Sequence, residues 1–576
     1  MIIEETVVAL RRLDLDRGAL LALAIEPGVG VAFATRDGSV VSCRDLSPVE
    51  VVRRVDDEFR PRWVVWGSAT IGALVAGGLR VRKCWDISAV QRLLVGGWRM
   101  DAARAWAGLH DLGDDLPTVA PVDLFTVPDD GDPDCAVRDD GHVKPEWLAP
   151  DFEWTTERLE QWARLAERAA TLQEARVSAI EDRPRASSTV RSESAAELLC
   201  AELSADGLPM DRGAAESLVA SFVGPRPKSD ADAAEQRRER DSRVLSHASN
   251  QSCDLRNPGH VKSLLRGIGV ELPDTRAWRL EAIRGTHPLI DALLEWRKAE
   301  RISTTFGYGW LDEHLGVDGR LRGEWSGCDG AAGRMTASAG LHNMPANLRV
   351  AVIAEADHVF VRADLGQIEP RILAAVSGDA ALAEATTEDD MYQPVAGQLG
   401  VDRATAKVAV LGAMYGQTTG HGAAALRGLE SAYPVAMRYL TDADLAGQVG
   451  RDIRTYGGRL VRMGSTGGSE FNDRESRSRS AAQGRYGRNA MVQGAAAEFF
   501  KVWAVTVRAR AAALDARIVL CLHDELLVHA PIGNAAAVTE LIVDCLDDAA
   551  RHWAPSDAVR FVAEVSTIHS WADAKS

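Results

Sequence analysis

Two apolar segments in the second half of the chain each carry an aspartate at the point where a predicted strand ends. In residues 359–379, a strand-forming run leads into Asp364, and a turn and a helical pattern follow. In residues 518–531, two apolar runs flank the acidic tripeptide HDE (523–525), which predicts a hairpin with the acids at its tip. Charge beside buried strands is costly without a partner. A metal ion held between Asp364 and Asp524 would supply that partner.

A third segment, residues 401–417, predicts a helix with one functional stripe. Arg403, Lys407, Leu411 and Tyr415 recur every four residues and therefore share a slowly rotating face. Arginine binds phosphate oxygens in a forked geometry, and lysine offers a point charge with a transferable proton. The stripe suits a triphosphate followed by a sugar and a base. An exposed basic helix with a packed tyrosine is the alternative that this segment alone leaves open.

The charge distribution is uneven. The net charge of −17 argues against a polyanionic partner, but residues 403–510 hold 16 basic and 8 acidic residues. Residues 111–140, by contrast, hold ten aspartates and one arginine. One region is therefore a candidate surface for a polyanion within an acidic protein, with a solvated Arg-rich helical face as the alternative. Because only eight of the 66 cations are lysines, a lysine at a chemical position such as Lys407 is informative.

The pattern along the chain predicts four zones within three or four domains. These are a small α/β domain (1–110), an Asp-, Pro- and Gly-rich loop (111–150), a mostly helical zone (151–310) and a mixed zone with the chemistry (320–576). Amphipathic helices are expected at 156–181, 193–222, 229–247 and 288–305, and a mobile loop at 464–478.

Several classes of protein are excluded by composition. The sequence contains no run of eighteen apolar residues, so a membrane span is not expected, and no secretory signal is evident at the N-terminus. The eight cysteines are scattered, with no CxxC pair, which excludes a disulfide framework or a zinc ribbon and favours a reducing, cytoplasmic location.

Taken together and in order, the three segments resemble the polymerase motifs of the DNA polymerase I family (family A DNA polymerases). The family patterns Asp-x-Ser-Gln-Ile-Glu-x-Arg, Arg-x3-Lys-x3-Phe-x3-Tyr-Gly and His-Asp-Glu appear here in recognisable form. GRMTASAGLHNMP (333–345) and RYGRNAMVQGAAAEFFK (485–501) are similar to further stretches of the family. The resemblance covers roughly residues 190–576. It implies a right-hand fold of thumb, palm and fingers and templated DNA synthesis from deoxynucleoside triphosphates.

The resemblance also implies residue roles. Asp364 and Asp524, with the Leu365 carbonyl, would hold two Mg²⁺ ions (Mn²⁺ as a possible substitute), and Glu525 would support the primer end. Arg403 and Lys407 would bind the triphosphate, and Lys407 would protonate the leaving pyrophosphate. The remaining positions implied to contact nucleotide or DNA are Leu411, Tyr415, Glu369, Gln367 and His523 for the dNTP, and Arg334, Asn343, Arg485, Asn489 and Gln493 for primer and template.

This sequence departs from the family in several places. Leu411 stands where the family has Phe or Tyr beside the sugar, and Leu365-Gly366 replaces Tyr-Ser after the first aspartate. Tyr392 stands where the family has a histidine in the fingers. The link between Pro345 and Val350 is shorter than usual and lacks one family arginine near the triphosphate.

The N-terminal zone has a weaker similarity to the 3′–5′ exonuclease domain of the same family, carried by the stretches 26–33, 84–94 and 166–172. That chemistry needs four carboxylates, and this zone has no Asp-x-Glu in its first strand and no acid in WGSATIGAL (66–74). Glu167 is at best a substitute, and Asp86 is interpreted as structural. The zone is expected to be an inactive, ribonuclease-H-like scaffold, with no room in the sequence for a 5′-nuclease domain.

The full expectation is an α/β and α+β multidomain chain that works as a monomer on primer–template DNA and dNTPs, away from membranes, in a bacterial or phage-infected cell. A single-subunit RNA polymerase, a DNA-binding relic and a functional nuclease are the alternatives. The expected parts are a degenerate exonuclease domain (1–185), thumb and start of palm (186–320), palm (321–385), fingers and return to palm (386–510) and palm (511–576).

Overall fold

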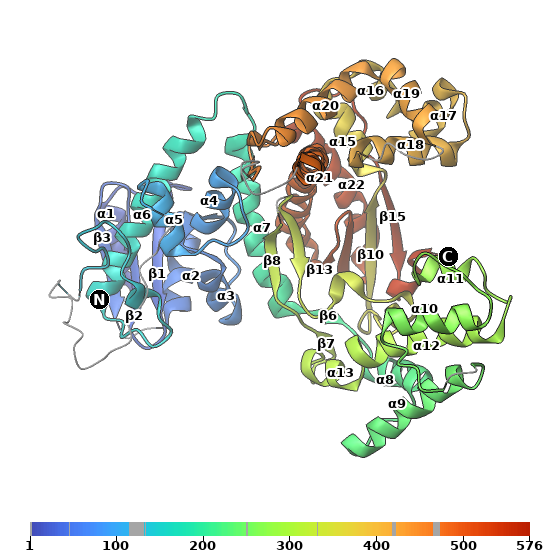
Figure 1. Ribbon diagram of the computed structural model, residues 1–576. Coiled ribbons are helices and arrows are strands. Elements are labelled where there is room, and N and C mark those ends of the chain that lie inside the picture. Colours follow the sequence, from blue (N-terminus) through green and yellow to red (C-terminus); the bar gives the residue numbers. More distant parts are fainter. Residues whose placement is uncertain are drawn as a thin grey trace. The chain divides into compact units, whose positions relative to one another are not determined.

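The computed structural model describes residues 3–44, 47–113, 132, 134–248, 251–330, 332–416, 422–464 and 473–575. The chain divides into two compact units, and many of their elements are labelled in Figure 1. The first unit comprises Met1–Asp206, Glu324–Thr336 and Asp357–Thr567, and the second comprises Gly207–Gly323, Ala337–Ala356 and Ile568–Ser576.

The N-terminal part of the first unit is built on a five-stranded sheet of order β3-β2-β1-β4-β5. β1 pairs antiparallel with β2 and parallel with β4, so the sheet is mixed. The strands are β1 (Leu20–Glu26), β2 (Gly30–Ala34), β3 (Val40–Arg44), β4 (Arg62–Val65) and β5 (Cys84–Asp86). The small α/β domain expected at 1–110 is present, and the apolar runs of the sequence at 20–25, 29–35 and 63–66 coincide with β1, β2 and β4 within one residue.

The two faces of β1 carry side chains of different size, and helices cover both faces of the sheet (Figure 1). Along β1, Leu21 and Leu23 enter one core, whereas Ala22 and Ala24 enter the other, as the two-residue period of a strand requires. The leucine face meets α1 (Ile3–Arg12), α2 (Pro48–Phe59) and α3 (Ser68–Ala76). The alanine face meets α4 (Ile87–Val95), α5 (Ala102–Leu109) and α6 (Thr156–Ser178).

The C-terminal part of the first unit contains a four-stranded sheet of order β13-β14-β10-β15. Its strands are β10 (His358–Leu365), β13 (Arg517–Cys521), β14 (Glu525–Pro531) and β15 (Ala563–Ile568). The helices of this part are α7 (Ala186–Asp206), α15 (Ile368–Ser377), α16 (Ala380–Ala385), α17 (Tyr392–Leu399), α18 (Arg403–Tyr415), α19 (Gly422–Ala432), α20 (Pro434–Gln448), α21 (Asp473–Ala511) and α22 (Ala535–Trp553). Short hairpins are formed by β8 (Trp325–Asp329) with β9 (Arg334–Ala337) and by β11 (Ile453–Arg454) with β12 (Leu460–Val461).

The second unit is mostly helical. Its core gathers apolar residues of α9, α10, α11 and α12. Its elements are α8 (Arg212–Val223), α9 (Asp230–Leu245), α10 (Pro258–Gly267), α11 (Ala277–Glu281), α12 (Pro288–Thr305), α13 (Tyr308–His314), α14 (Ala346–Arg349) and the small pair β6 (Leu208–Pro209) with β7 (Arg320–Leu321).

Three expectations about local structure are corrected. The helix expected at 193–222 is two helices, α7 and α8, because Gly207 takes a left-handed conformation (φ +68°) and β6 follows it. The loop expected at 464–478 is helical from Asp473 onward, whereas residues 465–472 lie outside the described residues.

The third correction concerns the loop expected at 111–150. Residues 114–131 and 133 of this segment lie outside the described residues. The rest is not a plain linker, because Ala136, Val143 and Trp147 are buried in the alanine-face core.

No helix within the described ranges is both long and apolar enough to cross a bilayer.

Candidate active site

The two aspartates singled out from the sequence lie on neighbouring strand ends of the C-terminal sheet. β10 and β14 pair antiparallel with Asp364 opposite Glu525, and Asp524 occupies the turn just before β14. The Leu365 amide donates to the Asp524 carbonyl oxygen over 2.8 Å, which fixes the two segments against each other. The predicted hairpin, with its acids at the tip, is confirmed.

At this edge of the C-terminal sheet, burial and mutual repulsion disfavour the charged form of the carboxylates when no cation is bound. Burial, and then the charge of Asp524, raises the pKa of Asp364 to about 6. Burial, and then the charge of Glu525, raises the pKa of Asp524. Hard carboxylate and carbonyl oxygens are the ligands Mg²⁺ prefers, and a divalent cation would relieve the repulsion. The donor set therefore fits the expected metal.

Arg362, which the sequence analysis did not single out, contacts the same carboxylates. It precedes Asp364 by two residues on β10 and so lies on the same face of the strand. Its Nη2 lies 2.5 Å from Asp364 Oδ2 and 3.1 Å from Glu525 Oε2, and its side chain is only 5% exposed. An arginine at this point would compete with a bound metal ion for the carboxylate oxygens. The two-residue period of the strand was the signal that could have identified it.

Glu369 connects the segment after Asp364 to helix α18. Its two carboxylate oxygens accept from Arg334 Nη2 (2.8 Å) and from the Tyr415 hydroxyl (2.6 Å). Burial, and then the hydrogen bond to Glu369, raises the pKa of Tyr415 to about 12. Gln493 of α21 also hydrogen-bonds the Tyr415 side chain. The structure thus brings together four of the predicted site residues.

Helix α18 presents the predicted stripe away from its packed face. The buried residues of α18 are Ala406, Ala409, Val410, Ala413 and Met414. Arg403 and Lys407 are exposed, and Leu411 and Tyr415 are half-buried. Leu411 is therefore not part of the helix's packing core, and all four residues lie on the side of α18 away from its buried face.

The N-terminal end of α18 is tied to the same region as its C-terminal end. Arg403 forms an ion pair with Asp390 and lies over the ring of Tyr392 at 5.7 Å. Gln367, which has a left-handed backbone (φ 51°), accepts from the Met391 amide over 3.1 Å and donates to Asp390 over 3.4 Å. Arg403 is thus connected through Asp390 to Gln367, and Tyr415 contacts Glu369, so both ends of the stripe are linked to the segment that follows Asp364.

Arg371, the last residue of the first motif, has a structural role. It is fully buried and donates to four backbone carbonyls at 2.5–2.8 Å, which belong to Thr386, Glu388, Asp389 and Arg560. Burial lowers the pKa of its guanidinium to about 10. It fixes the loop that carries Asp390.

The replacement of serine by Gly366 also has a local cause. The Gly366 amide donates to the Val562 carbonyl over 2.9 Å. A Cβ at position 366 would lie 2.8 Å from Val562 Cγ2, so a side chain here requires the neighbouring segment to move.

The other predicted contact residues lie nearby or in the second unit. Desolvation, and then the charge of Arg334, lowers the pKa of His523. The side chain of Arg485 lies against Gly416, at the end of α18. The Oδ1 atom of Asn489 is buried without a hydrogen-bond partner among the described residues. Asn343 belongs to the second unit, where its carbonyl accepts from Arg301.

The excess of cations in residues 403–510 is only partly a surface feature. Arg459 and Lys501 are buried, and both pair with Glu193 of α7, at 2.5 and 2.7 Å. Arg508 pairs with Glu202 of the same helix. The local charge therefore overstates what a polyanion could contact, because these three cations neutralise internal acids.

On the alanine face of the N-terminal sheet, the described residues do not gather the carboxylates that a two-metal nuclease needs. Ala22 and Ala24 pack in one core with alanines of α6. Glu167 is 9% exposed, accepts from Thr171 over 2.7 Å and has a pKa raised by burial. Asp86 is buried, caps α4 by accepting from the Ala89 amide and has a pKa raised to about 7 by burial and then by Glu197.

The fold is that of a polymerase. It is similar to the solved POL domain of Pol1 from M. smegmatis, a structure in complex with DNA primer-template and dNTP. The TM-score is 0.69 and the sequence identity is 20%. The match covers 99% of this chain and 98% of that chain. The family model "DNA polymerase family A" matches residues 269–573, more than half of the chain. The chain belongs to DNA polymerase family A.

Curated relatives match about half of this chain. DNA polymerase I of Deinococcus radiodurans is 28% identical over 328 residues, which are 51% of this chain and 33% of the relative. DNA polymerase theta of Caenorhabditis elegans is 26% identical over 51% of this chain and 19% of the relative. The thermostable DNA polymerase I of Thermus aquaticus is 27% identical over 52% and 38%. The matched part thus spans well under half the length of each of these relatives.

Proposed function

We propose that this chain is a DNA-dependent DNA polymerase that extends a primer 3′-OH with dNTPs by a two-metal-ion mechanism, in replication or repair. One observation carries the proposal. Helix α18, which carries the predicted phosphate-binding stripe, is tied at both ends to the segment that follows Asp364, at Arg403 through Asp390 and Gln367 and at Tyr415 through Glu369. A triphosphate bound along the stripe would therefore lie beside the carboxylates.

The metal-binding residues in this proposal are Asp364, Asp524 and the Leu365 carbonyl. Two Mg²⁺ ions, or Mn²⁺ in their place, would activate the primer hydroxyl and neutralise charge on the transferred phosphoryl group. Glu525, paired with Arg362, supports this edge of the sheet beside the primer end.

Substrate binding is assigned to the exposed side of α18. Arg403 and Lys407 bind the triphosphate, and Lys407 gives a proton to the leaving pyrophosphate, which arginine cannot do at neutral pH. Leu411 contacts the sugar, Tyr415 contacts the nascent base pair, and Gln367 orients the loop that holds Arg403.

Sugar selection is assigned to Glu369. Its carboxylate is fixed by Tyr415 and Arg334, so it cannot swing away from a bulkier sugar without losing both hydrogen bonds. A ribose 2′-OH would meet this fixed group. DNA contacts with primer, template or the minor-groove side of the new pair are assigned to Arg334, Asn343, Arg485, Asn489 and Gln493, and His523 is assigned to the incoming dNTP.

The N-terminal domain is proposed to be an exonuclease-like scaffold without nuclease chemistry. The alanine contact between β1 and α6 occupies the face where paired carboxylates would be needed. Glu167 accepts from the Thr171 hydroxyl, and Asp86 caps α4.

The test is primer extension with a labelled primer and Mg²⁺, comparing the parent with Asp364→Ala and Asp524→Ala. Extension by either variant should fall by at least about a thousandfold, because each removes a metal-binding carboxylate. Primer–template affinity should stay within about twofold. Asp547→Ala, an exposed acid on α22, is the matched control and should extend normally. Normal extension by Asp364→Ala would overturn the assignment.

The same assay separates a DNA polymerase from a single-subunit RNA polymerase. The parent should incorporate dNTPs in strong preference to rNTPs, and Glu369→Ala should narrow the preference. Efficient rNTP incorporation by the parent would favour the RNA polymerase.

A further inference from the structure

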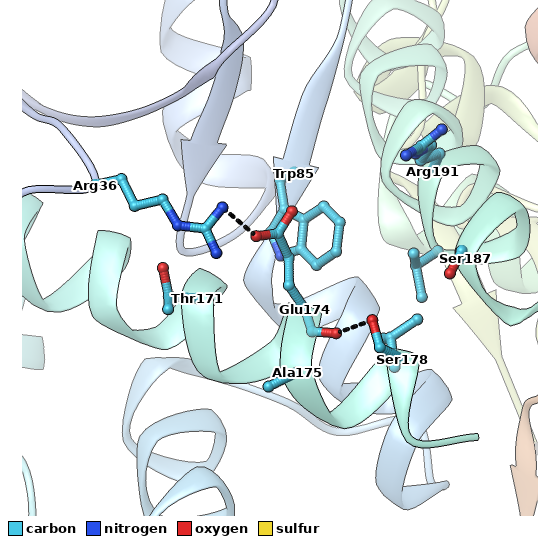
Figure 2. Close-up of a pocket in the computed structure, with 10 residues that line it drawn as sticks. Arg36, Trp85, Thr171, Glu174, Ala175, Ser178, Ser187 and Arg191 are labelled. Carbon is cyan, nitrogen blue, oxygen red and sulfur yellow. Dashed lines mark hydrogen bonds and ion pairs between the residues drawn. The ribbon is translucent and has the colours of Figure 1, made fainter. Parts of the chain in front are cut away.

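Arg488 of α21, which the proposed mechanism does not use, contacts the C-terminal end of α18 from the interior of the protein. It is 9% exposed, and its Nη1 donates to the Ala413 carbonyl in the last turn of α18 over 3.0 Å. The ion pair of Arg36 with Glu174, drawn in Figure 2, shows the contrast, because its two side chains are 68% and 34% exposed. Arg488 is therefore a buried cation directed at the helix that carries the predicted substrate stripe.

The contact of Arg488 satisfies a backbone group at a helix end. The last carbonyls of a helix lack the usual intrahelical partners, and a cation beside them is favourable for the helix dipole. The Ala413 carbonyl also accepts from the amide of Gly416, the left-handed cap of α18 (φ +67°), over 3.4 Å. Among the described residues, Arg488 thus gives this carbonyl the shorter of its two hydrogen bonds. Tyr415 lies in the same turn, two residues after Ala413.

A close crossing of α20 and α21 holds Arg488 in place. Its Nη2 lies 3.4 Å from Asp444 Oδ2 of α20, and Asp444 Oδ1 accepts from Gln448 over 3.1 Å. A Cβ at Gly484 would overlap Asp444 Oδ1, and a Cβ at Gly487 would lie 2.7 Å from a backbone carbonyl oxygen of α20. Glycine at these two positions permits the close approach of the helices. Arg488 therefore extends to α18 from a closely packed pair of helices.

Tyr415 connects the last turn of α18 to the residue assigned to sugar selection. Its hydroxyl donates to Glu369 over 2.6 Å, and Gln493 of α21 hydrogen-bonds its side chain. Helix α21 thus holds the backbone of this turn through Arg488 and the Tyr415 side chain through Gln493. Loss of Arg488 would release the backbone of the turn, and Glu369 would be less firmly fixed by Tyr415.

We propose that Arg488 is a positioning residue for sugar selection. By fixing the last turn of α18 it holds Tyr415, and through Tyr415 it holds Glu369, where the carboxylate meets a ribose 2′-OH. The inference rests on the proposed DNA polymerase activity and on the role assigned to Glu369. In this scheme Arg488 contacts neither the nucleotide nor the DNA.

The test compares kcat/KM of the full chain for a dNTP and the matching rNTP opposite the same template base. Arg488→Met keeps an unbranched side chain but removes its donors, and it should lower the dNTP-to-rNTP ratio at least about fivefold, because Glu369 excludes ribose less strictly. Arg488→Lys keeps a charged donor for the Ala413 carbonyl and should recover most of the ratio. An equal loss with both nucleotides in Arg488→Met would mean that Arg488 only stabilises the fold, and it would overturn the proposal.

Two controls remove an arginine ion pair away from α18. Arg510→Met lies on the same helix as Arg488 and removes the pair with Asp548 of α22. Arg36→Met removes the pair with Glu174 in the N-terminal domain. Both should keep the parent's ratio within about twofold, and a loss of selectivity equal to that of Arg488→Met in either control would overturn the proposal.

A further variant guards against misfolding, because Arg488→Met leaves Asp444 without its arginine. Arg488→Met combined with Asp444→Asn leaves no unpaired charge and should show the same narrowed ratio. The parent's ratio in this folded double variant overturns the proposal. Tyr415→Phe tests the route, because it already removes the hydrogen bond to Glu369, so adding Arg488→Met should change its ratio by less than about twofold. An undiminished effect of Arg488→Met in the Tyr415→Phe protein also overturns the proposal.

Amide hydrogen exchange without nucleotide or DNA separates this inference from the proposed function. Exchange in the last turn of α18 should be at least about tenfold faster in Arg488→Met than in the parent, and unchanged in Arg510→Met. If the parent incorporates neither dNTP nor rNTP, the proposed function fails, whereas faster exchange in Arg488→Met would still support the hold of Arg488 on this turn. Unchanged exchange in Arg488→Met overturns the inference whatever the activity of the parent.

Discussion

The first unit contains two sheets whose central strands differ in what they place against the neighbouring helix. β1 places Ala22 and Ala24 in a close-packed contact with alanines of α6. β10 ends in Asp364, half-exposed, with a pKa raised to about 6. The alanine side of β1 is therefore fully packed, whereas β10 ends in an accessible carboxylate whose charged form is disfavoured.

The difference shows what separates a scaffold from a site. Small apolar side chains let a helix approach and exclude water, which stabilises the domain but leaves no ligands. At β10 the mutual repulsion of Asp364, Asp524 and Glu525 is only partly offset by Arg362. Carboxylates with raised pKa values and only partly neutralised charge are typical of catalytic sites, where a bound metal ion would neutralise the remaining charge.

The largest expected effect comes from placing acids on the alanine strand. Ala22→Asp with Ala24→Glu should lower the free energy of unfolding by about 3–5 kcal/mol, because it buries unpaired charges. Urea unfolding followed by tryptophan fluorescence measures the loss. Pro27→Asp, an exposed acid just after β1, is the control and should shift stability by no more than about 0.5 kcal/mol.

The same proteins test the missing nuclease. The parent should not shorten a mismatched primer in Mg²⁺ or Mn²⁺, and the double variant should not gain this activity. Shortening by the repurified parent that disappears in Glu167→Ala would contradict the scaffold assignment. A double variant as stable as Pro27→Asp would show that the alanine contact is open enough to take charge.

Much of the site could be predicted from sequence because its signals are local. The strand–turn–helix around Asp364, the HDE hairpin and the stripe of α18 each depend on neighbours a few residues away. The contact from Arg403 to Asp390 and from Tyr415 to Glu369 depends on the tertiary fold, which spacing does not encode. The break at Gly207 was missed because an amphipathic pattern can continue across a turn, and the buried roles of Arg459 and Lys501 were hidden by counting charge along the chain.

Arg362 offers a smaller and sharper test at the acidic edge. Arg362→Ser should tighten Mn²⁺ binding to the DNA-free protein by five- to thirtyfold, or about 1–2 kcal/mol, because a competing cation is removed from shared carboxylate oxygens. Electron paramagnetic resonance of free Mn²⁺ measures this directly, and the half-saturating Mg²⁺ concentration for extension should fall in parallel.

The controls separate charge from geometry at this position. Arg362→Lys keeps the charge and should bind Mn²⁺ close to the parent, and Arg551→Ser, an exposed arginine on α22, should change nothing. Weaker Mn²⁺ binding by Arg362→Ser would mean that the arginine aligns the carboxylates for the metal instead of competing with it.

The smallest expected effect concerns Leu411, where the accessible side of α18 departs most from the family. Leu411 is half-buried and lies outside the buried set of the helix, on the stripe with Arg403 and Lys407. A phenylalanine would fill space beside the sugar, and a tyrosine would add a hydroxyl near a missing 3′-OH.

Leu411→Phe should therefore raise the single-turnover rate of dNTP incorporation. The expected decrease in activation free energy is about 1 kcal/mol, the lower end of what one apolar contact in a specificity pocket contributes. Leu411→Tyr should in addition relieve discrimination against dideoxynucleotides. Val543→Phe, at a 42% exposed position of α22, adds the same ring away from α18 and should leave both rate and discrimination unchanged. Equal rates and equal dideoxynucleotide discrimination in all four proteins would mean that Leu411 does not face the sugar, and the substrate would then have to lie along a different part of α18.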